Sequence, residues 1–191
     1  YLRAETIFAA FSNAGAGIAV VTAKEKLRLL LGKGMKFGIC FSSEKSDSCN
    51  LAEHGIENVL DLVGWPLPDV YSAELSLFAM EADIRILARD RPDLMYLSLT
   101  DFIQHAHAPG EPEADAFYKR LDDAFGRLQA LGAIIGITAD HGMSDKSRDD
   151  GTPNVIYLQD ELDASLGENS TRVILPITDP YIAHHGALGG F

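Results

Sequence analysis

Positive charge is scarce in this sequence. Its 191 residues include 16 lysines and arginines against 28 aspartates and glutamates, for a formal net charge of −12. Nucleic acids and anionic membrane surfaces attract concentrated positive charge, so we expect neither as a partner. The sequence also lacks any run of about 18 apolar residues, the length that a membrane-spanning helix needs. A small anionic substrate would therefore require metal ions or a few well-placed lysines at its site.

Cysteines and leader-like segments are similarly few. The sequence has only two cysteines, Cys40 and Cys49, which is too few for a disulfide framework. They do not form a CxxC pair, and we predict that both are reduced. No export signal is visible, which favours a cytoplasmic location. The chain starts at Tyr1 without an initiator methionine. We expect residues 1–191 to form a single α/β domain that belongs to a longer catalytic chain.

Short apolar runs alternate with amphipathic helical patterns. The runs predict strands at 18–21, 37–41, 94–98 and 133–138, and shorter ones at 155–158 and 173–175. The helical patterns cover 7–14, 23–31, 69–89, 112–131 and 160–166. This alternation predicts an α/β fold in which a mostly parallel sheet is sandwiched between helices. Ligands of such sheets bind beyond the carboxyl ends of the strands, where functional residues should be sought.

Two Asp/His pairs follow predicted strands. Asp101 and His105 come after the strand at 94–98, and Asp140 and His141 come after the strand at 133–138. Each pair by itself has an ordinary explanation as a helix cap or a polar turn. At the ends of two neighbouring strands, however, the four side chains would meet in one crevice. Carboxylate and imidazole together suit zinc, and also manganese or iron.

The two pairs resemble the metal-binding motifs of the alkaline phosphatase superfamily. The branch that they resemble contains the nucleotide pyrophosphatase/phosphodiesterases and the phosphonoacetate hydrolases. The residues at 20–28, 100–110, 138–143, 153–160 and 174–181 resemble the phosphonoacetate hydrolase family in particular. The resemblance implies an alkaline-phosphatase-like core that holds two zinc ions. It assigns Asp101 and His105 to one zinc, and Asp140 and His141 to the other.

The same resemblance supplies roles for further residues. Lys24 and Lys26 match a lysine pair that contacts the substrate's carboxylate, although lysines at a helix start are more often ordinary surface residues. The family's threonine nucleophile and a third metal-binding aspartate lie before Tyr1, and a zinc-binding histidine lies after Phe191. We therefore expect no catalytic nucleophile in this chain, and no turnover by the chain alone.

The activity that the resemblance implies is hydrolysis of the carbon–phosphorus bond of phosphonoacetate, a small phosphonate, to acetate and phosphate. One alternative keeps the fold and the metals but takes a phosphodiester or nucleotide as substrate. Another is a truncated domain without catalytic function. His184 and His185 could have a structural role or lie near the metals, and the sequence leaves both roles open. A homodimer is expected only because dimers are the commonest oligomers.

Overall fold

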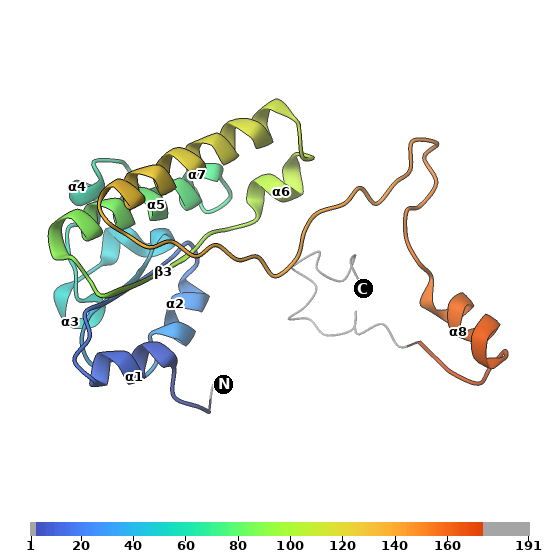
Figure 1. Ribbon diagram of the computed structural model, residues 1–191, viewed down its shortest axis with the longest axis horizontal. Helices are drawn as coiled ribbons and strands as arrows, with labels where there is room; N and C mark the ends of the chain where they lie inside the picture. Colours follow the sequence, from blue (N-terminus) through green and yellow to red (C-terminus); the bar gives the residue numbers. More distant parts are fainter. Residues whose placement is uncertain (1–2, 174–191) are drawn as a thin grey trace. The chain divides into compact units, whose positions relative to one another are not determined.

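The fold is built from one small parallel sheet with helices on both faces, which confirms the α/β prediction (Figure 1). The computed structural model describes residues 3–173. Its helices are α1 Ile7–Asn13, α2 Glu25–Leu31, α3 Leu51–His54, α4 Val59–Val63, α5 Ala73–Asp90, α6 Phe102–Ala106, α7 Pro112–Ala130 and α8 Leu158–Leu166, with a 3-10 helix, η1, at Ser43–Ser48. Its strands are β1 Ile18–Thr22, β2 Ile39–Ser42 and β3 Leu94–Ser98. The chain divides into two compact units between Met143 and Ser144.

The sheet has the strand order β2-β1-β3, and both pairings are parallel. Thr22 at the end of β1 is in register with Ser42 on one side and Ser98 on the other. All three strands therefore end at the same edge. Parallel neighbours of this kind need crossover connections, which α2 provides between β1 and β2 and the longer segment ending in α5 provides between β2 and β3.

Alternate residues of the central strand face opposite helical layers. Ala19 and Val21 of β1 pack with α4 and α5, in a cluster that includes Phe78. Ile18 and Val20 pack on the other face with Phe8 of α1 and with Cys40. All five residues of β1 are buried, as expected for the central strand of a sheet that is covered on both sides. Cys40 is a buried free thiol, as predicted.

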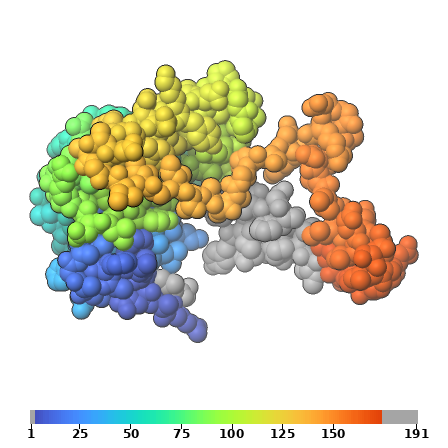
Figure 2. Space-filling model, in the orientation of Figure 1, coloured from blue at the N-terminus to red at the C-terminus, as the bar shows by residue number. Residues whose placement is uncertain are grey.

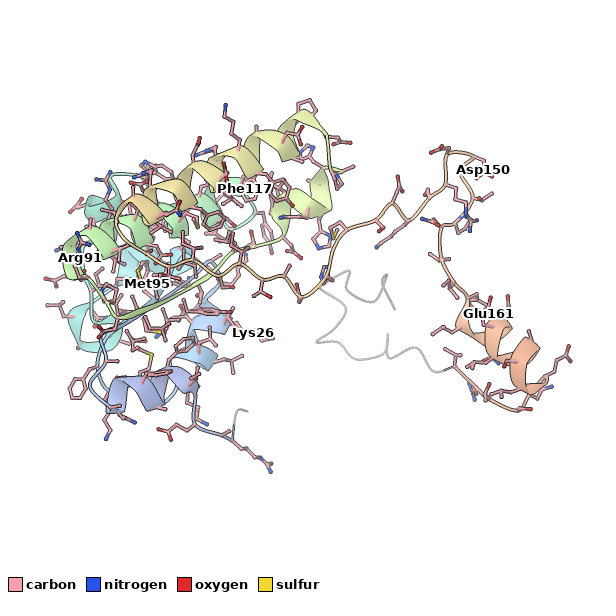
Figure 3. The ribbon with its side chains drawn as sticks, viewed as in Figure 1. Lys26, Arg91, Met95, Phe117, Asp150 and Glu161 are labelled. Carbon is pink, nitrogen blue, oxygen red and sulfur yellow. The ribbon has the colours of Figure 1, made fainter. Side chains whose placement is uncertain are left out.

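A second helical layer forms where α7 packs on α5. Phe117 and Leu121 of α7 lie in one cluster with Met80 and Ile84 of α5, and Met95 of β3 packs against it (Figure 3). Because α5 contacts the sheet on one side and α7 on the other, twelve of its residues are buried. Within residues 3–173, no helix is long and apolar enough to cross a membrane.

The strand predicted at 133–138 is not formed in the structure. Ile134 is fully exposed and Ile137 is 72% exposed, and Figure 2 displays this segment, which follows α7, at the surface. The apolar sequence provides β propensity, but a strand also needs a neighbour for its backbone hydrogen bonds. In the described part of the chain, β3 pairs with β1 alone and forms no ladder with this segment.

The two later strand predictions end differently. At 155–158 the structure has no strand, because Leu158 begins α8 and the preceding Val155 and Ile156 are exposed and unpaired. The predicted strand at 173–175 extends outside the described residues. The helix predicted at 160–166 is present as α8, which starts two residues earlier.

Candidate metal and anion site

The carboxyl edge of the sheet brings two of the predicted functional segments together. Lys24 follows β1, and Asp101 follows β3, the direct neighbour of β1. The amide of Ala23 donates a hydrogen bond of 2.8 Å to the carbonyl of Ser98, which extends the contact between the two segments beyond the ladder. The sheet therefore positions the predicted lysine segment beside the first predicted metal-binding pair.

Asp101 and His105 lie one helical turn apart and face each other. Asp101 is the N-cap of α6, and its Oδ2 lies 2.8 Å from Nε2 of His105. The helical turn itself is closed by the amide of His105, which donates to the carbonyl of Asp101 over 3.0 Å. Both side chains are about half exposed or more, at 62% and 47%. The i,i+4 spacing predicted from the sequence therefore does bring the two groups together.

Asp140 and His141 are more exposed. Oδ2 of Asp140 lies 3.9 Å from Nε2 of His141, and the aspartate is 92% exposed. Nδ1 of His141 lies 2.9 Å from the carbonyl of Gly142, and this contact raises the pKa of the imidazole. The carboxylates of Asp140 and Asp101 raise that pKa further. Within residues 3–173, three or more ligand atoms of His, Cys, Asp or Glu lie within 4.8 Å of one another only in a different cluster, at His107, so the structure does not gather the two pairs into one cluster.

These ligand atoms suit a divalent ion chemically. Two neighbouring ligands of a tetrahedral zinc, each bonded at about 2.0–2.1 Å, are separated by about 3.3 Å. The separations of 2.8 Å and 3.9 Å within the two pairs lie on either side of that value. The donor set of carboxylate oxygen and imidazole nitrogen is one that zinc prefers. The spacing within each pair is therefore compatible with two ligands of one ion.

The two predicted substrate lysines have different environments. Lys24, the N-cap of α2, is half-buried, and its Nζ donates a 3.0 Å hydrogen bond to the carbonyl of Val70. The same ammonium lies 5.1 Å from the ring centroid of Tyr71. Lys26 is exposed and extends from α2 (Figure 3). Lys24 is thus a positioned cation, whereas Lys26 is a solvated one.

Sequence reasoning missed two groups near these residues. Tyr71 had no local signal, because its contact with Lys24 joins segments far apart in the chain. Nδ1 of His107 lies 3.2 Å from a carboxylate oxygen of Glu111 and 3.8 Å from one of Glu113. The i,i+4 spacing of His107 and Glu111 in the sequence could have predicted their contact. The three ligand atoms of this cluster lie within 4.8 Å of one another. Glu111 is the N-cap of α7 and Glu113 lies in its first turn, where the helix dipole favours carboxylates, so the cluster has an explanation without a metal.

Comparison with known proteins identifies the family of this chain. A model of the family described as type I phosphodiesterase / nucleotide pyrophosphatase matches residues 42–184. This chain belongs to that family. The match includes all four residues of the two Asp/His pairs. It also includes His184 but ends before His185, and both histidines lie outside the described residues.

Two crystal structures of phosphonoacetate hydrolase from Sinorhizobium meliloti 1021 are similar to this chain. The complex with phosphonoformate has a TM-score of 0.81, and the complex with phosphonoacetate has a TM-score of 0.80. In both, 57% of the aligned residues are identical, and the alignment covers 98% of this chain. This chain spans 46% of the length of the matched enzyme chains. The predicted resemblance to phosphonoacetate hydrolase is therefore confirmed.

Proposed function

We propose that this chain contributes two zinc sites and a lysine pair to an enzyme that hydrolyses phosphonoacetate. Asp101 and His105 would hold one zinc, and Asp140 and His141 the other. The observation that carries the proposal is the 2.8 Å separation of Asp101 and His105 at the sheet edge, in a chain 57% identical to phosphonoacetate hydrolase. The organisation as a single domain that belongs to a longer catalytic chain stays a prediction.

The chemistry divides between the ions and the residues of this chain. Zinc, when bound, supplies Lewis-acid stabilisation of phosphoryl oxygens and lowers the pKa of a nucleophile. In the net reaction, water adds to phosphorus, the carbon–phosphorus bond breaks, and the departing methylene carbon takes up a proton to give acetate. Negative charge spreads onto the acetate carboxylate as that bond breaks. Lys24 and Lys26 would bind this carboxylate and stabilise the developing charge.

The zinc sites can be tested by direct titration. In the protein expressed from its full coding sequence, we expect Asp101→Ala and His141→Ala each to abolish one zinc site, because each variant removes a ligand from a different pair. Calorimetry at neutral pH and the metal content of the purified protein would measure this. His107→Ala is the matched control, and we expect it to bind zinc as the wild type does. Zinc binding that survives both ligand substitutions would refute the proposal.

A phosphodiesterase acting on nucleotides is the second candidate. The observation in its favour is that the matching family model describes phosphodiesterases and nucleotide pyrophosphatases. Phosphate release from phosphonoacetate, compared with cleavage of p-nitrophenyl phosphate diesters by the same preparation, separates the two. A diester carries no carboxylate for the lysines to bind. If zinc binds and neither substrate reacts, the chain has a non-catalytic role.

A further inference from the structure

The ammonium of Lys24 is held by a segment far away in the sequence. Its Nζ donates to the carbonyl of Val70 over 3.0 Å and lies 5.1 Å from the ring centroid of Tyr71. A cation at this distance from an aromatic ring is attracted by the negative face of the ring. The Tyr71 ring is 79% exposed, so core packing does not account for its position.

The segment that carries Tyr71 is itself well ordered by local hydrogen bonds. The amide of Tyr71 donates to Oδ1 of Asp69 over 2.7 Å, and Oγ of Ser72 donates to the carbonyl of Asp69 over 2.8 Å. Pro66 and Pro68 restrict the backbone that leads into this turn. On the other side, Oγ1 of Thr22 donates to the carbonyl of Lys24 over 2.8 Å. The backbone is therefore held by hydrogen bonds on both sides of the Lys24–Tyr71 contact.

We propose that Tyr71 is a positioning residue that holds Lys24 for the carboxylate of the substrate and so helps to select carboxylated phosphonates. This inference rests on the proposed function. A lysine ammonium has three N–H donors, and the Val70 carbonyl uses one of them. The contacts with Val70 and Tyr71 restrict the otherwise flexible side chain, so less conformational entropy is lost when an anion binds. Lys26, by contrast, is exposed, and its side chain makes no such contact with the turn at residues 69–72.

Inhibitor binding tests this role more directly than activity alone. In the zinc-loaded protein from the full coding sequence, Tyr71→Ala should weaken binding of phosphonoformate by roughly 3- to 30-fold, the range that loss of a cation–π contact accounts for. Binding of inorganic phosphate should not change, because phosphate has no carboxylate. Tyr71→Phe keeps the ring and should bind phosphonoformate as the wild type does. The kcat/KM for phosphonoacetate should fall in Tyr71→Ala by the same factor as phosphonoformate binding.

The controls separate this inference from general damage to the site. Tyr118→Ala removes another partly exposed tyrosine and should leave both inhibitors unaffected. Tyr71→Leu keeps an apolar side chain without the aromatic ring, so it should weaken phosphonoformate binding by the same factor of roughly 3- to 30-fold and provides the test if the alanine variant does not fold. Equal losses for phosphonoformate and phosphate, or no loss for either, would overturn the inference. A wild type that releases no phosphate from phosphonoacetate would instead overturn the proposed function.

Discussion

At the scale of single residues, Asp83 is an ionisable side chain in an unfavourable environment. It lies on α5 with no exposed surface, and within residues 3–173 neither carboxyl oxygen has a hydrogen-bond partner. Burial raises the pKa of this carboxyl well above its ordinary value, because the charged form loses its hydration. The folded protein therefore retains the proton of Asp83 at pH values where the unfolded chain releases it.

This retention predicts a stability that falls with rising pH. Above about pH 4 the unfolded chain loses the proton first, so the wild type should lose stability relative to Asp83→Asn, with a slope approaching about 1.4 kcal/mol per pH unit. The fall should stop once the pH exceeds the raised pKa. Urea unfolding of both proteins across this pH range measures the difference. Asp122→Asn, an exposed change on α7, is the control, and parallel profiles for Asp83→Asn and the wild type would contradict the prediction.

At the scale of elements, the end of α3 is joined closely to the start of β2. Gly55 ends α3 in the left-handed conformation, at φ +68°, and its amide donates to the carbonyl of Leu51 over 3.2 Å. A Cβ added there would lie 2.0 Å from the carbonyl oxygen of Gly38, which precedes β2. Two backbone segments thus approach more closely than any side chain would allow.

A pair of glycine substitutions separates conformational strain from this close approach. Gly64 ends α4 at φ +78°, and its added Cβ would meet nothing within 4 Å. Gly64→Ala should therefore cost only the left-handed strain, about 1 kcal/mol, whereas Gly55→Ala should cost about 3 kcal/mol or more. Chemical denaturation of the two variants measures both. Equal destabilisation would show that the backbone contact contributes nothing.

At the scale of the whole molecule, a buried carboxylate joins two helices of this acidic protein through an arginine. Glu81 of α5 receives hydrogen bonds of 2.6 Å and 3.0 Å from Arg127 of α7, and one of 2.8 Å from Arg85. Burial raises the pKa of Glu81, but the hydrogen bonds and charges of the two arginines outweigh it and leave that pKa below its ordinary value. The folded state therefore favours the ionised form of Glu81.

The contact between α5 and α7 should accordingly weaken in acid. At neutral pH, Glu81→Gln should lower the free energy of unfolding by about 1–3 kcal/mol, because charged hydrogen bonds are lost. This difference should shrink as the pH falls through the lowered pKa, where Glu81 itself becomes protonated. Urea unfolding at neutral and acid pH tests both statements. Glu74→Gln is the control, since Glu74 is exposed and 3.7 Å from Arg120; a comparable loss there would argue against a special role for Glu81.

Much of the fold could be predicted from the sequence because the deciding signals are local. The apolar run at Leu94–Ser98 has the bounds of β3, and Pro112 begins α7 as its position at a helix start predicts. The helix predicted from Asp69 begins later, at Ala73, because the Asp69 side chain bonds to the amide of Tyr71 within a turn. The Asp101–His105 contact was also predictable, because a helical turn alone determines it.

Sequence by itself thus determined the α/β class, the bounds of β3 and the contact of Asp101 with His105 that follows this strand. Only the tertiary structure decided which groups, distant in the sequence, lie beside each strand and side chain. It left the apolar segment at 133–138 unpaired, buried Asp83 without a partner, and brought Tyr71 to Lys24. The reason is physical: propensity and periodicity act within a few residues, whereas hydrogen-bond ladders, burial and cation–π contacts depend on groups that are distant in the chain.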